Sequence, residues 1–396
     1  MAEQSLNISQ NTAEQVHQGH KARLLYVLKV PPPLHGSSMM NKQVADSVLL
    51  QTSFNSRILP MRFSKSVDDI GKIYAGKIFI WFGFVWQLLG LLYSFRPQLV
   101  YFALSSRGAA FYKDAAMVAM IKLFGVPIVY HLHARGFAET AGKNALAGVI
   151  CRFVFRGTDV ICLSSQVADD LEGVHKGKIH VMPNGVPDFA GNGILGRKPV
   201  NKVPRLLFLS NLIECKGVID FIRALGIINS KGLVFEADII GQPKDVSIER
   251  AQNLLSELGL EQVVKLHGGM YGEEKAKMLV NADVFVFPTR YNNEAFPLVL
   301  LEAMQNGIAV IANRWAAIPE ILAEGKAGLL TIPADIEDLS LALSLLIGNS
   351  ELMRSLQAEG RKRYENLYTL PSFENNLKNL LMEISARGRA VKGQNV

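Results

Sequence analysis

The chain has 396 residues, of which 49% are hydrophobic and 19% are charged. That length is too great for one compact core and predicts two domains, while the composition is that of an ordinary globular protein. The net charge of +7 suits ordinary surface chemistry or an anionic partner, such as a nucleotide diphosphate or an acidic membrane leaflet. The basic residues are dispersed, and no zinc-finger, basic-zipper or RNA-recognition signature is present, so nucleic acid is not an expected partner.

The three cysteines, Cys151, Cys162 and Cys215, argue against a disulfide framework. Their number is odd and no CxxC pair occurs, so neither paired bridges nor a zinc site is expected. A reducing cytoplasm fits this usage best. Residues 1–20 are polar and carry no apolar stretch or cleavage-site pattern, so we expect a loose tail rather than a signal peptide.

In the first half of the chain, short apolar runs alternate with helical segments such as Ala109–Phe124 and Ala145–Phe155. The runs are mostly continuously apolar, as in parallel strands that are covered on both faces. Strands that alternate with helices predict right-handed βαβ units. The expected strands are Leu24–Val30, Ile58–Phe63, Gln98–Leu104, Ile128–His133, Val160–Ser164 and Ile179–Met182.

One apolar segment, Ile78–Tyr93, raises the question of a membrane span. It reads IFIWFGFVWQLLGLLY, only sixteen residues, is interrupted by Gln87 and is flanked by Lys72, Lys77 and Arg96. A spanning helix needs about 20 apolar residues, and a shorter run is more often a core or interfacial helix. We therefore expect either a core helix of the first domain or a helix that lies on a membrane surface.

The stretch Phe189–Pro204 is rich in Gly, Pro and basic residues and is the best interdomain linker in the sequence. The alternation of strands and helices resumes after it. The final segment, Pro371–Arg387, has a helical pattern, and we expect it to pack back onto the first domain. The expected strands of the second half are Arg205–Ser210, Phe235–Ile240, Val263–His267, Val284–Pro288, Ala309–Ala312 and Leu329–Ile332.

These elements predict an α/β protein with two doubly wound, Rossmann-like parallel-sheet domains that face each other across a cleft. Ligands of such sheets bind beyond the carboxyl ends of the strands. The expected parts are a disordered tail at residues 1–20, a first domain at 21–190, a linker at 191–204, a second domain at 205–370 and a C-terminal helix at 371–390.

Residues 283–303 carry the most informative pattern. A buried strand ends at Pro288, a polar loop follows, and a helix is expected to open near Pro297, because proline in the first turn of a helix fixes the backbone for it. Glu294 then lies in the loop, and Glu302 lies about two turns further on, near the same face. The helix start offers unpaired amides and a positive dipole end, which suit a diphosphate, and the carboxylates can accept hydrogen bonds from hydroxyl groups.

The segment EAFPLVLLEAM, residues 294–304, closely resembles the E-x7-E motif of the family-4 glycosyltransferases, whose two-domain architecture is called GT-B. The resemblance implies that Glu294 contacts the transferred sugar and that Glu302 contacts the ribose of the nucleotide. Pro297 stands where the family often has a glycine. Proline has no N–H group, so this position cannot donate the backbone hydrogen bond that a glycine could. Backbone amides between the two glutamates meet the sugar and the diphosphate in the family, and the matching positions are Phe296, Pro297, Leu298 and Val299.

A second motif follows the first strand of the second domain. Residues 211–217 read NLIECKG, where the family carries R-x4-K-G. The resemblance implies that Lys216 neutralises the departing pyrophosphate, while Asn211 takes the donor-binding place of the family's arginine, so that one cation is missing. The segments that close the donor pocket in the family are matched by Gly307–Ala312, Ile318–Ile321 and Gly325–Leu329.

In the first domain, residues 31–38 read PPPLHGSS and take the place of a glycine-rich loop that approaches the donor phosphates in the family. The resemblance implies that Gly36 permits close backbone approach and that Ser37 donates a hydrogen bond to the donor. His133 matches the family's histidine near the transferred sugar, although a histidine at a strand end is as often structural. Arg135 is placed to meet a phosphate of the donor or the acceptor.

The resemblance, which runs from about Leu24 to Met382, implies a hexosyltransferase-type enzyme that moves a sugar from a nucleotide-diphosphate sugar to an acceptor hydroxyl with retention. We expect neither a metal nor a cofactor, because Lys216 and the helix start carry the developing charge and the donor loop has no DxD-like pair. Three alternatives stay open. They are an epimerase or phosphorylase on the same scaffold, an oxidoreductase, which the lack of a G-x-G-x-x-G motif disfavours, and a non-catalytic glycan-binding relative.

Bacterial cell-surface polysaccharide or glycolipid assembly is the setting that the resemblance suggests, with a sugar or a lipid-linked saccharide as acceptor. Apolar residues with interspersed lysines between Lys65 and Tyr93 suit an acceptor at an anionic membrane surface. We expect a cytoplasmic protein, and peripheral binding to the inner face of the membrane is the alternative to a core role for this segment.

Overall fold

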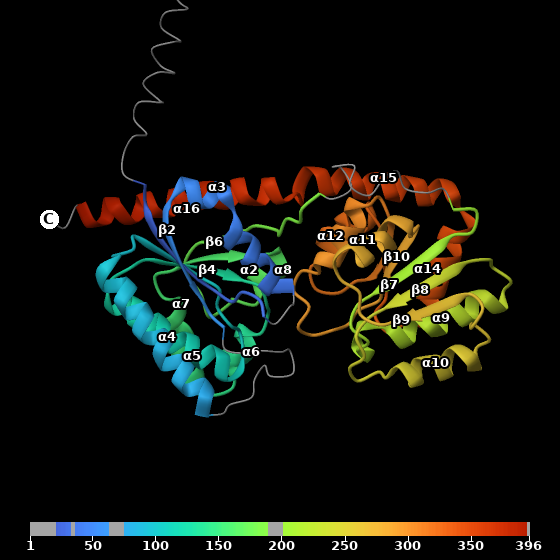
Figure 1. Cartoon of the computed structure of the whole chain (residues 1–396), viewed down its shortest axis with the longest axis horizontal. Coiled ribbons are helices and arrows are strands. Elements are labelled where there is room, and N and C mark those ends of the chain that lie inside the picture. Colours follow the sequence, from blue (N-terminus) through green and yellow to red (C-terminus); the bar gives the residue numbers. More distant parts are fainter. Residues whose placement is uncertain (1–20, 33–35, 63–74, 189–200, 394–396) are drawn as a thin grey trace, which may run out of the picture. The chain divides into compact units, whose positions relative to one another are not determined.

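The structure is a computed structural model that describes residues 21–32, 36–62, 75–188 and 201–393. The predicted tail and most of the predicted linker lie outside these residues. The chain forms two six-stranded sheets flanked by helices, and the pairings that set their registers are parallel (Figure 1). The α/β fold with two doubly wound parallel sheets is thereby confirmed.

The first sheet has the strand order β2-β1-β3-β4-β5-β6 and contains all six strands predicted for this half. Strand β2 forms one edge of the sheet and has mostly exposed side chains, whereas β1 and β3, the next two strands, are almost wholly buried. The strands are β1 (Arg23–Leu28), β2 (Asn55–Pro60), β3 (Leu99–Phe102), β4 (Ile128–Leu132), β5 (Asp159–Cys162) and β6 (Ile179–Val181). The helices of this half are α2 (Gly36–Asp46), α3 (Val48–Ser53), α4 (Ala75–Ser94), α5 (Gly108–Leu123), α6 (Phe137–Gly142), α7 (Ala145–Phe155) and α8 (Ser165–Asp169).

The second sheet has the order β12-β11-β10-β7-β8-β9 and again contains every predicted strand. The strands are β7 (Arg205–Leu209), β8 (Glu236–Ile240), β9 (Val264–His267), β10 (Val284–Phe287), β11 (Ala309–Asn313) and β12 (Leu329–Thr331). The longer helices are α9 (Val218–Ser230), α10 (Ile248–Glu257), α11 (Gly272–Asn281), α12 (Leu298–Gln305), α14 (Ile336–Gly348) and α15 (Ser350–Leu367). The short ones are η2 (Glu214–Lys216), α13 (Ile318–Ile321) and η3 (Ala323–Gly325).

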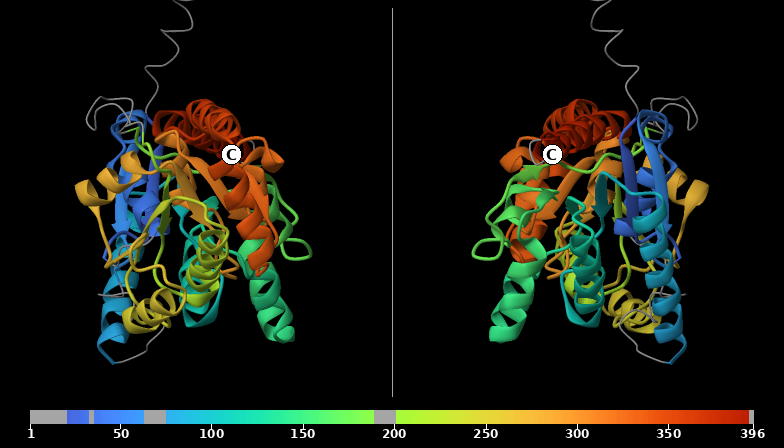
Figure 2. Two further views of the ribbon diagram at one scale, coloured as in Figure 1. Left: turned by 90° about the vertical axis from the view of Figure 1, so that its right-hand side faces the viewer. Right: turned by 90° about the vertical axis from the view of Figure 1, so that its left-hand side faces the viewer.

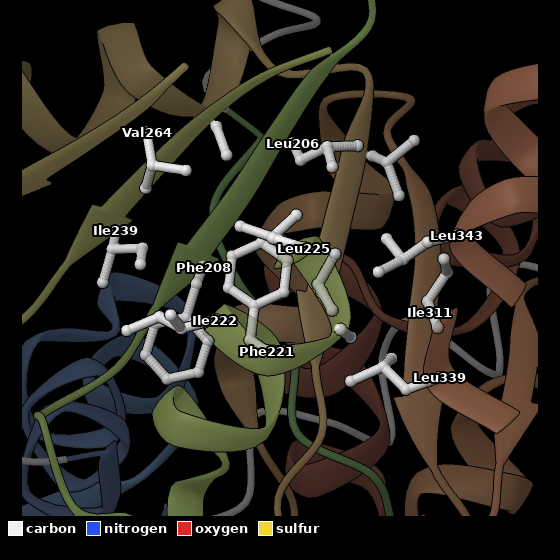
Figure 3. Close-up of a cluster of buried hydrophobic side chains, with 14 of the residues drawn as sticks. Leu206, Phe208, Phe221, Ile222, Leu225, Ile239, Val264, Ile311, Leu339 and Leu343 are labelled. Carbon is white, nitrogen blue, oxygen red and sulfur yellow. The ribbon is translucent and has the colours of Figure 1, made fainter. Parts of the chain in front are cut away.

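Helices cover both faces of the second sheet, and successive strand residues point to opposite faces, so both sets of side chains are buried. Leu206 and Phe208 of β7 join one buried cluster, while Leu207 and Leu209 join another. Figure 3 shows the first of these clusters, in which Phe221 of α9 packs with the strand residues. Continuously apolar strands therefore reflect a sheet that is buried on both faces.

Helix α16 (Leu370–Gly393) contains the predicted C-terminal helix and begins one residue before Pro371. By packing, residues up to 103 group with 116–130 and with residues from 378 onward, whereas 104–115 group with 131–377. The latter part of α16 thus belongs with the first group. The domain boundaries expected at 190 and 205 stay predictions, because residues 189–200 lie outside the described part of the chain.

Helix α4 contains the apolar segment that raised the question of a membrane span. Phe84, Val85 and Leu88 on this helix are buried, whereas Phe79 and Trp86 are exposed. Within the described ranges, no helix is both long enough and apolar enough to cross a bilayer.

Candidate active site

The loop after β10 contacts the turn after β7. The two strands are neighbours in the sheet, with Leu206 opposite Val284, so the segments that follow them lie side by side. The backbone N–H of Arg290 donates to the carbonyl oxygen of Cys215 at 2.8 Å. At Gly217, φ is 87°, and a Cβ atom there would lie 2.3 Å from the carbonyl oxygen of Pro288. The glycine is required because any other side chain would strain the backbone and collide with the β10 loop.

Lys216 and Glu294, the two residues predicted to act on the departing phosphate and the sugar, meet in this place. The ammonium group of Lys216 forms an ion pair with Oε2 of Glu294, and the two side chains are only 14% and 12% exposed. The same ammonium lies 4.7 Å from the ring centroid of Tyr291 and 5.5 Å from that of Phe287, within the range of cation–π attraction. The structure thus collects a cation, a carboxylate and two aromatic rings at the carboxyl ends of β7 and β10.

The backbone that carries Glu294 is held by its own loop and by residues at the end of β11 and just after it. The indole N–H of Trp315 donates to the carbonyl oxygen of Tyr291 at 2.9 Å, and the N–H of Glu294 donates to the same oxygen at 2.9 Å. The amide of Asn313 donates to the carbonyl oxygen of Thr289 at 3.3 Å. These bonds position the carboxylate through its backbone, without contact to its charge.

Helix α12 begins at Leu298, one residue later than the sequence analysis expected. Pro297 is the N-cap residue, with φ −72° and ψ 109°, and no side chain caps the helix. The ring restricts φ to a value that suits both a helix and an extended chain, so the pattern could not separate the two. The first amides of α12 lack partners four residues back, and they are the donors that a bound anion would use.

The side chains at the predicted donor-contact positions around the start of α12 pack against the core. The side chain of Phe296 is buried and lies edge-on to Tyr368, with ring centroids 6.1 Å apart. That contact anchors the loop in the core, so only the backbone of Phe296 is left for the predicted role. Leu298 and Val299 are partly buried against the same core.

Glu302 has a different cationic partner from Glu294. Lys275 of α11 donates to Oε1 of Glu302 at 2.7 Å, and both side chains are 24% exposed. Lys275 was not predictable as a site residue, because a contact between two helices leaves no signal in local spacing. The two glutamates of the motif are thus each neutralised by a lysine from another element.

A third ion pair, which the sequence analysis also missed, lies in the β10 loop. Arg290 pairs with Asp220 in the first turn of α9, and Asp220 is buried. Arg290 is two residues from Pro288 in the predicted loop, so its position in the sequence was the only available signal.

Asn211 is exposed on the turn after β7, where its carbonyl oxygen accepts from the N–H of Ile213 at 2.8 Å.

His133, a predicted site residue, follows β4 and is half-buried beside His131. The ring centroids of His131 and His133 are 4.2 Å apart. His131 is fully buried, and burial, followed by the neighbouring His133, holds the pKa of its imidazole well below the usual value. Arg135 is half-buried two residues further on. The roles of His133 and Arg135 towards a donor stay predictions.

Gly36 and Ser37 lie in a helix rather than in the loop that the sequence analysis expected. Gly36 is the first residue of α2, Ser37 follows it, and Ser38 is buried in the same turn. The motif was interpreted as a loop because the family carries a glycine-rich loop at this place, yet a glycine and two serines are also common where a helix begins. The donor-binding roles of Gly36 and Ser37 stay predictions.

The three cysteines are free, and Cys151 and Cys162 are buried. In the part of the chain that the structure describes, no group of three or more His, Cys, Asp or Glu side chains is arranged to hold a metal ion.

Comparison with known families finds a match in each half of the chain. Residues 197–363 match the family model described as glycosyl transferases group 1, and residues 70–188 match the model described as Glycosyltransferase Family 4. Both halves are thus similar in sequence to glycosyltransferases, and the two parallel six-stranded sheets agree with the GT-B architecture.

Several curated relatives share part of this sequence. The MMP alpha-(1->4)-mannosyltransferase of Mycolicibacterium hassiacum is 33% identical over 31% of this chain and 29% of its own length. The putative colanic acid biosynthesis glycosyltransferase WcaL of Salmonella typhimurium is 28% identical over 45% of each chain. The sulfoquinovosyl transferase SQD2 of Arabidopsis thaliana is 25% identical over 70% of this chain and 55% of its own length. The chain thus spans between 29% and 55% of the length of these relatives.

Solved structures with the same fold cover nearly the whole chain. A glycosyltransferase from Rickettsia africae superposes with a TM-score of 0.71 at 16% identity and covers 93% of this chain and 98% of its own. HepE of Anabaena, in complex with UDP, has a TM-score of 0.68 at 17% identity and covers 91% of this chain and 100% of its own. At such identities the likeness shows the fold alone.

Proposed function

We propose that the chain is a hexosyltransferase that moves a sugar from a nucleotide-diphosphate sugar to an acceptor hydroxyl with retention of configuration. The observation that carries the proposal is the ion pair of Lys216 and Glu294, which joins two loops at the carboxyl ends of neighbouring strands. Support comes from the structurally similar HepE, which was solved with UDP and with UDP-glucose. It also comes from relatives that are named for colanic acid and amylovoran biosynthesis.

The paired charges suggest how a donor would bind. Glu294 is the anion that neutralises Lys216 in this structure. A donor pyrophosphate at the start of α12 would offer a second anion to the same ammonium group and would release Glu294 to accept hydrogen bonds from the sugar. As the bond from the sugar to the phosphate breaks, negative charge grows on the leaving oxygen, and the ammonium and the helix amides stabilise it.

Retention follows if the acceptor attacks from the face that the pyrophosphate leaves. The new bond joins the acceptor oxygen to the anomeric carbon, the bond to the phosphate oxygen breaks, and the acceptor proton passes to the departing phosphate. This route uses no protein nucleophile, and we propose that it proceeds without a metal or an organic cofactor. Glu302, with Lys275, would hold the ribose.

We place this reaction in cell-surface polysaccharide or glycolipid assembly, in the cytoplasm. The acceptor would be a sugar or a lipid-linked saccharide, and the anionic inner face of the membrane would be a second partner. Nucleic acid is not proposed as a partner.

A donor screen with one variant tests the reaction. UDP-, GDP- and ADP-sugars are added to the protein, and we expect one of them to raise its melting temperature and to be consumed only with an acceptor. Glu294→Gln should keep the fold and lose at least about a hundredfold in turnover, as expected when a group that acts on the transition state is removed. Glu257→Gln, on the exposed side of α10, is the matched control.

Two outcomes would overturn the proposal. Full turnover by Glu294→Gln would remove that carboxylate from the site. Consumption of the sugar nucleotide with phosphate or water alone would favour the phosphorylase or epimerase alternative.

A further inference from the structure

The positive charge of the chain is concentrated in one segment. Residues 21–130 contain 13 Lys and Arg against 4 Asp and Glu, whereas the rest of the chain contains 29 against 31. The entire net excess of +7 therefore arises in this segment, and the remainder is slightly acidic. A segment with such an imbalance attracts anionic surfaces and repels copies of itself.

Helix α4, within that segment, has an apolar face on each side. The face formed by Phe84, Val85, Leu88 and Leu92 is buried in the first packed unit. On the opposite face Phe79 is 76% exposed, Phe82 60%, Trp86 79% and Tyr93 74%. At about 100° per residue these four aromatic side chains fall within an arc of about 60°. We call this set the aromatic stripe; Figure 2 shows α4, in blue, at the outer side of its unit.

The composition of the stripe is that of an interfacial helix. No charged residue occurs between Ile78 and Ser94, and the stripe is aromatic rather than aliphatic. Single exposed apolar residues are ordinary, but a contiguous row of them marks an interaction surface. Trp and Tyr are enriched where protein meets the headgroup layer of a bilayer, because their rings are apolar at one end and polar at the other.

Arginines adjoin the stripe where α4 ends. A pocket of about 420 Å³ is lined there by Arg23, Tyr93, Arg96, Gln98 and Phe124, among others. Nε of Arg23 donates to the carbonyl oxygen of Arg96 at 2.9 Å, and the amide oxygen of Gln98 accepts from the backbone N–H of Arg23. These bonds are to neutral groups, so the positive charge at this end of the stripe is not cancelled by them.

Two further observations extend the same surface. The guanidinium of Arg57 lies 5.6 Å from the ring centroid of Phe95, just beyond α4. Leu123, next to the pocket residue Phe124, is 86% exposed. Apolar rings and guanidinium groups thus alternate at this end, as suits contact with both acyl chains and lipid phosphates.

We propose that the aromatic stripe and the adjoining Arg23, Arg57 and Arg96 are the docking surface for an anionic lipid bilayer. The proposal deepens the membrane partner of the proposed function and rests on it. Helix α4 lies in the headgroup layer with its stripe inserted, and the arginines meet lipid phosphates. The like charge of the segment argues against a second copy of the chain as the occupant.

Vesicle flotation of the full chain tests the surface. We expect the protein to float with vesicles of phosphatidylcholine and phosphatidylglycerol, and not with phosphatidylcholine alone. Raising NaCl from about 0.1 M to about 0.5 M should reduce the bound fraction, because the screening length shortens. Equal flotation with both vesicle types would overturn the role of the arginines.

Paired variants separate the stripe from general surface hydrophobicity. Phe82→Ser/Trp86→Ser should lower the ratio of bound to free protein by about tenfold or more, because two interfacial rings are lost. The control is Leu341→Ser/Leu345→Ser, which alters side chains that are 61% and 48% exposed on α14, and it should float like the wild type. Unchanged flotation of the first variant would overturn the proposal.

A second pair tests the charge. Arg96 has φ 51°, a conformation that asparagine also adopts, so Arg96→Asn removes charge without new strain. It should weaken flotation about fivefold, while Lys231→Asn, at an exposed position after α9, should not change it. Equal effects of the two substitutions would contradict a local docking surface.

The thermal shift caused by sugar nucleotides, measured on the same variants, separates this proposal from the proposed function. Stripe variants that bind the donor but do not float support the docking surface. A wild-type protein that floats but binds no sugar nucleotide keeps the surface and overturns the proposed reaction. A wild-type protein that binds the donor but never floats overturns the docking surface and leaves the proposed reaction standing. A wild-type dimer that is lost in Trp86→Ser would identify a second copy of the chain as the occupant of the stripe.

Discussion

The cations of the candidate active site and those beside α4 have different neighbours. Lys216, Lys275 and Arg290 each form an ion pair with a carboxylate. Arg23 and Arg96 donate instead to backbone carbonyl oxygens. Both regions carry positive charge, but among the described residues only the cations of the first region are paired with carboxylates.

This difference indicates two kinds of anion binding. A partly buried cation loses hydration, so a carboxylate beside it stabilises the empty site and can be exchanged for a phosphate. A surface cation stays hydrated and needs no such partner, so it can act at longer range on a charged surface. The first arrangement suits one specific ligand, and the second suits an extended one.

The largest effect is expected from removal of the paired cation Lys216. Lys216→Ala should lower turnover by about 10²–10³-fold, because the leaving phosphate loses its ammonium partner. Initial rates with the donor found in the screen measure this effect. Lys277→Ala, whose side chain is 63% exposed in a pair with Glu273, is the control. Wild-type turnover in Lys216→Ala would make the ion pair structural only.

A smaller effect is expected from the glycine that lets the two loops meet. Gly217→Ala places a Cβ atom against Pro288 and should reduce the free energy of unfolding by about 2–3 kcal/mol. Gly232→Ala has a similar φ of 75° with nothing within 4 Å, so it controls for backbone strain. Denaturant titration of both variants isolates the contact. Equal losses of unfolding free energy in the two variants would show that the contact with Pro288 contributes nothing beyond backbone strain.

The second ion pair of the motif provides a test of binding rather than chemistry. Glu302→Gln should raise the dissociation constant of the nucleoside diphosphate by about tenfold, as expected when a hydrogen bond to a charged acceptor is weakened. Calorimetric titration measures the change. A variant that binds normally but turns over slowly would instead place Glu302 in the chemical step.

The smallest effect concerns thiol reactivity. Burial raises the pKa of Cys151 to about 11 and that of Cys162 to about 12. Because the thiolate is the reactive form, both groups should stay inert to iodoacetamide at pH 8 and should become reactive only as the pH rises towards those values. The half-buried Cys215 should react first, although burial and then Asp245 raise its pKa as well.

The same reagent reports on the site. Cys215 precedes Lys216, so a bound sugar nucleotide should slow its alkylation severalfold. Mass spectrometry of the labelled peptides gives the rates. Alkylation of Cys162 as fast as that of Cys215 would contradict the burial that separates them.

Twelve strands and the strand–loop–helix context of Glu294 were predictable from the sequence. Apolar runs such as 284–287 are local signals, and they mark a strand wherever both faces of a sheet are covered. The position of Lys216 in a turn was also predictable from the local sequence, because it precedes a glycine and a turn must follow β7. The start of α2 was not predictable in this way, because glycine and serine occur both in loops and at helix starts.

The sequence by itself determined the strands of both sheets and helices such as α5 and α7, and it placed Glu294 and Lys216 after the ends of strands. Only the tertiary structure decided that these residues, 78 positions apart, share one ion pair, and that Arg290 and Lys275 find carboxylates on other elements. It also decided which side of the largely apolar α4 is buried. The physical reason is that secondary structure follows from local periodicity, whereas such contacts depend on the order of strands in a sheet and on what packs against each face.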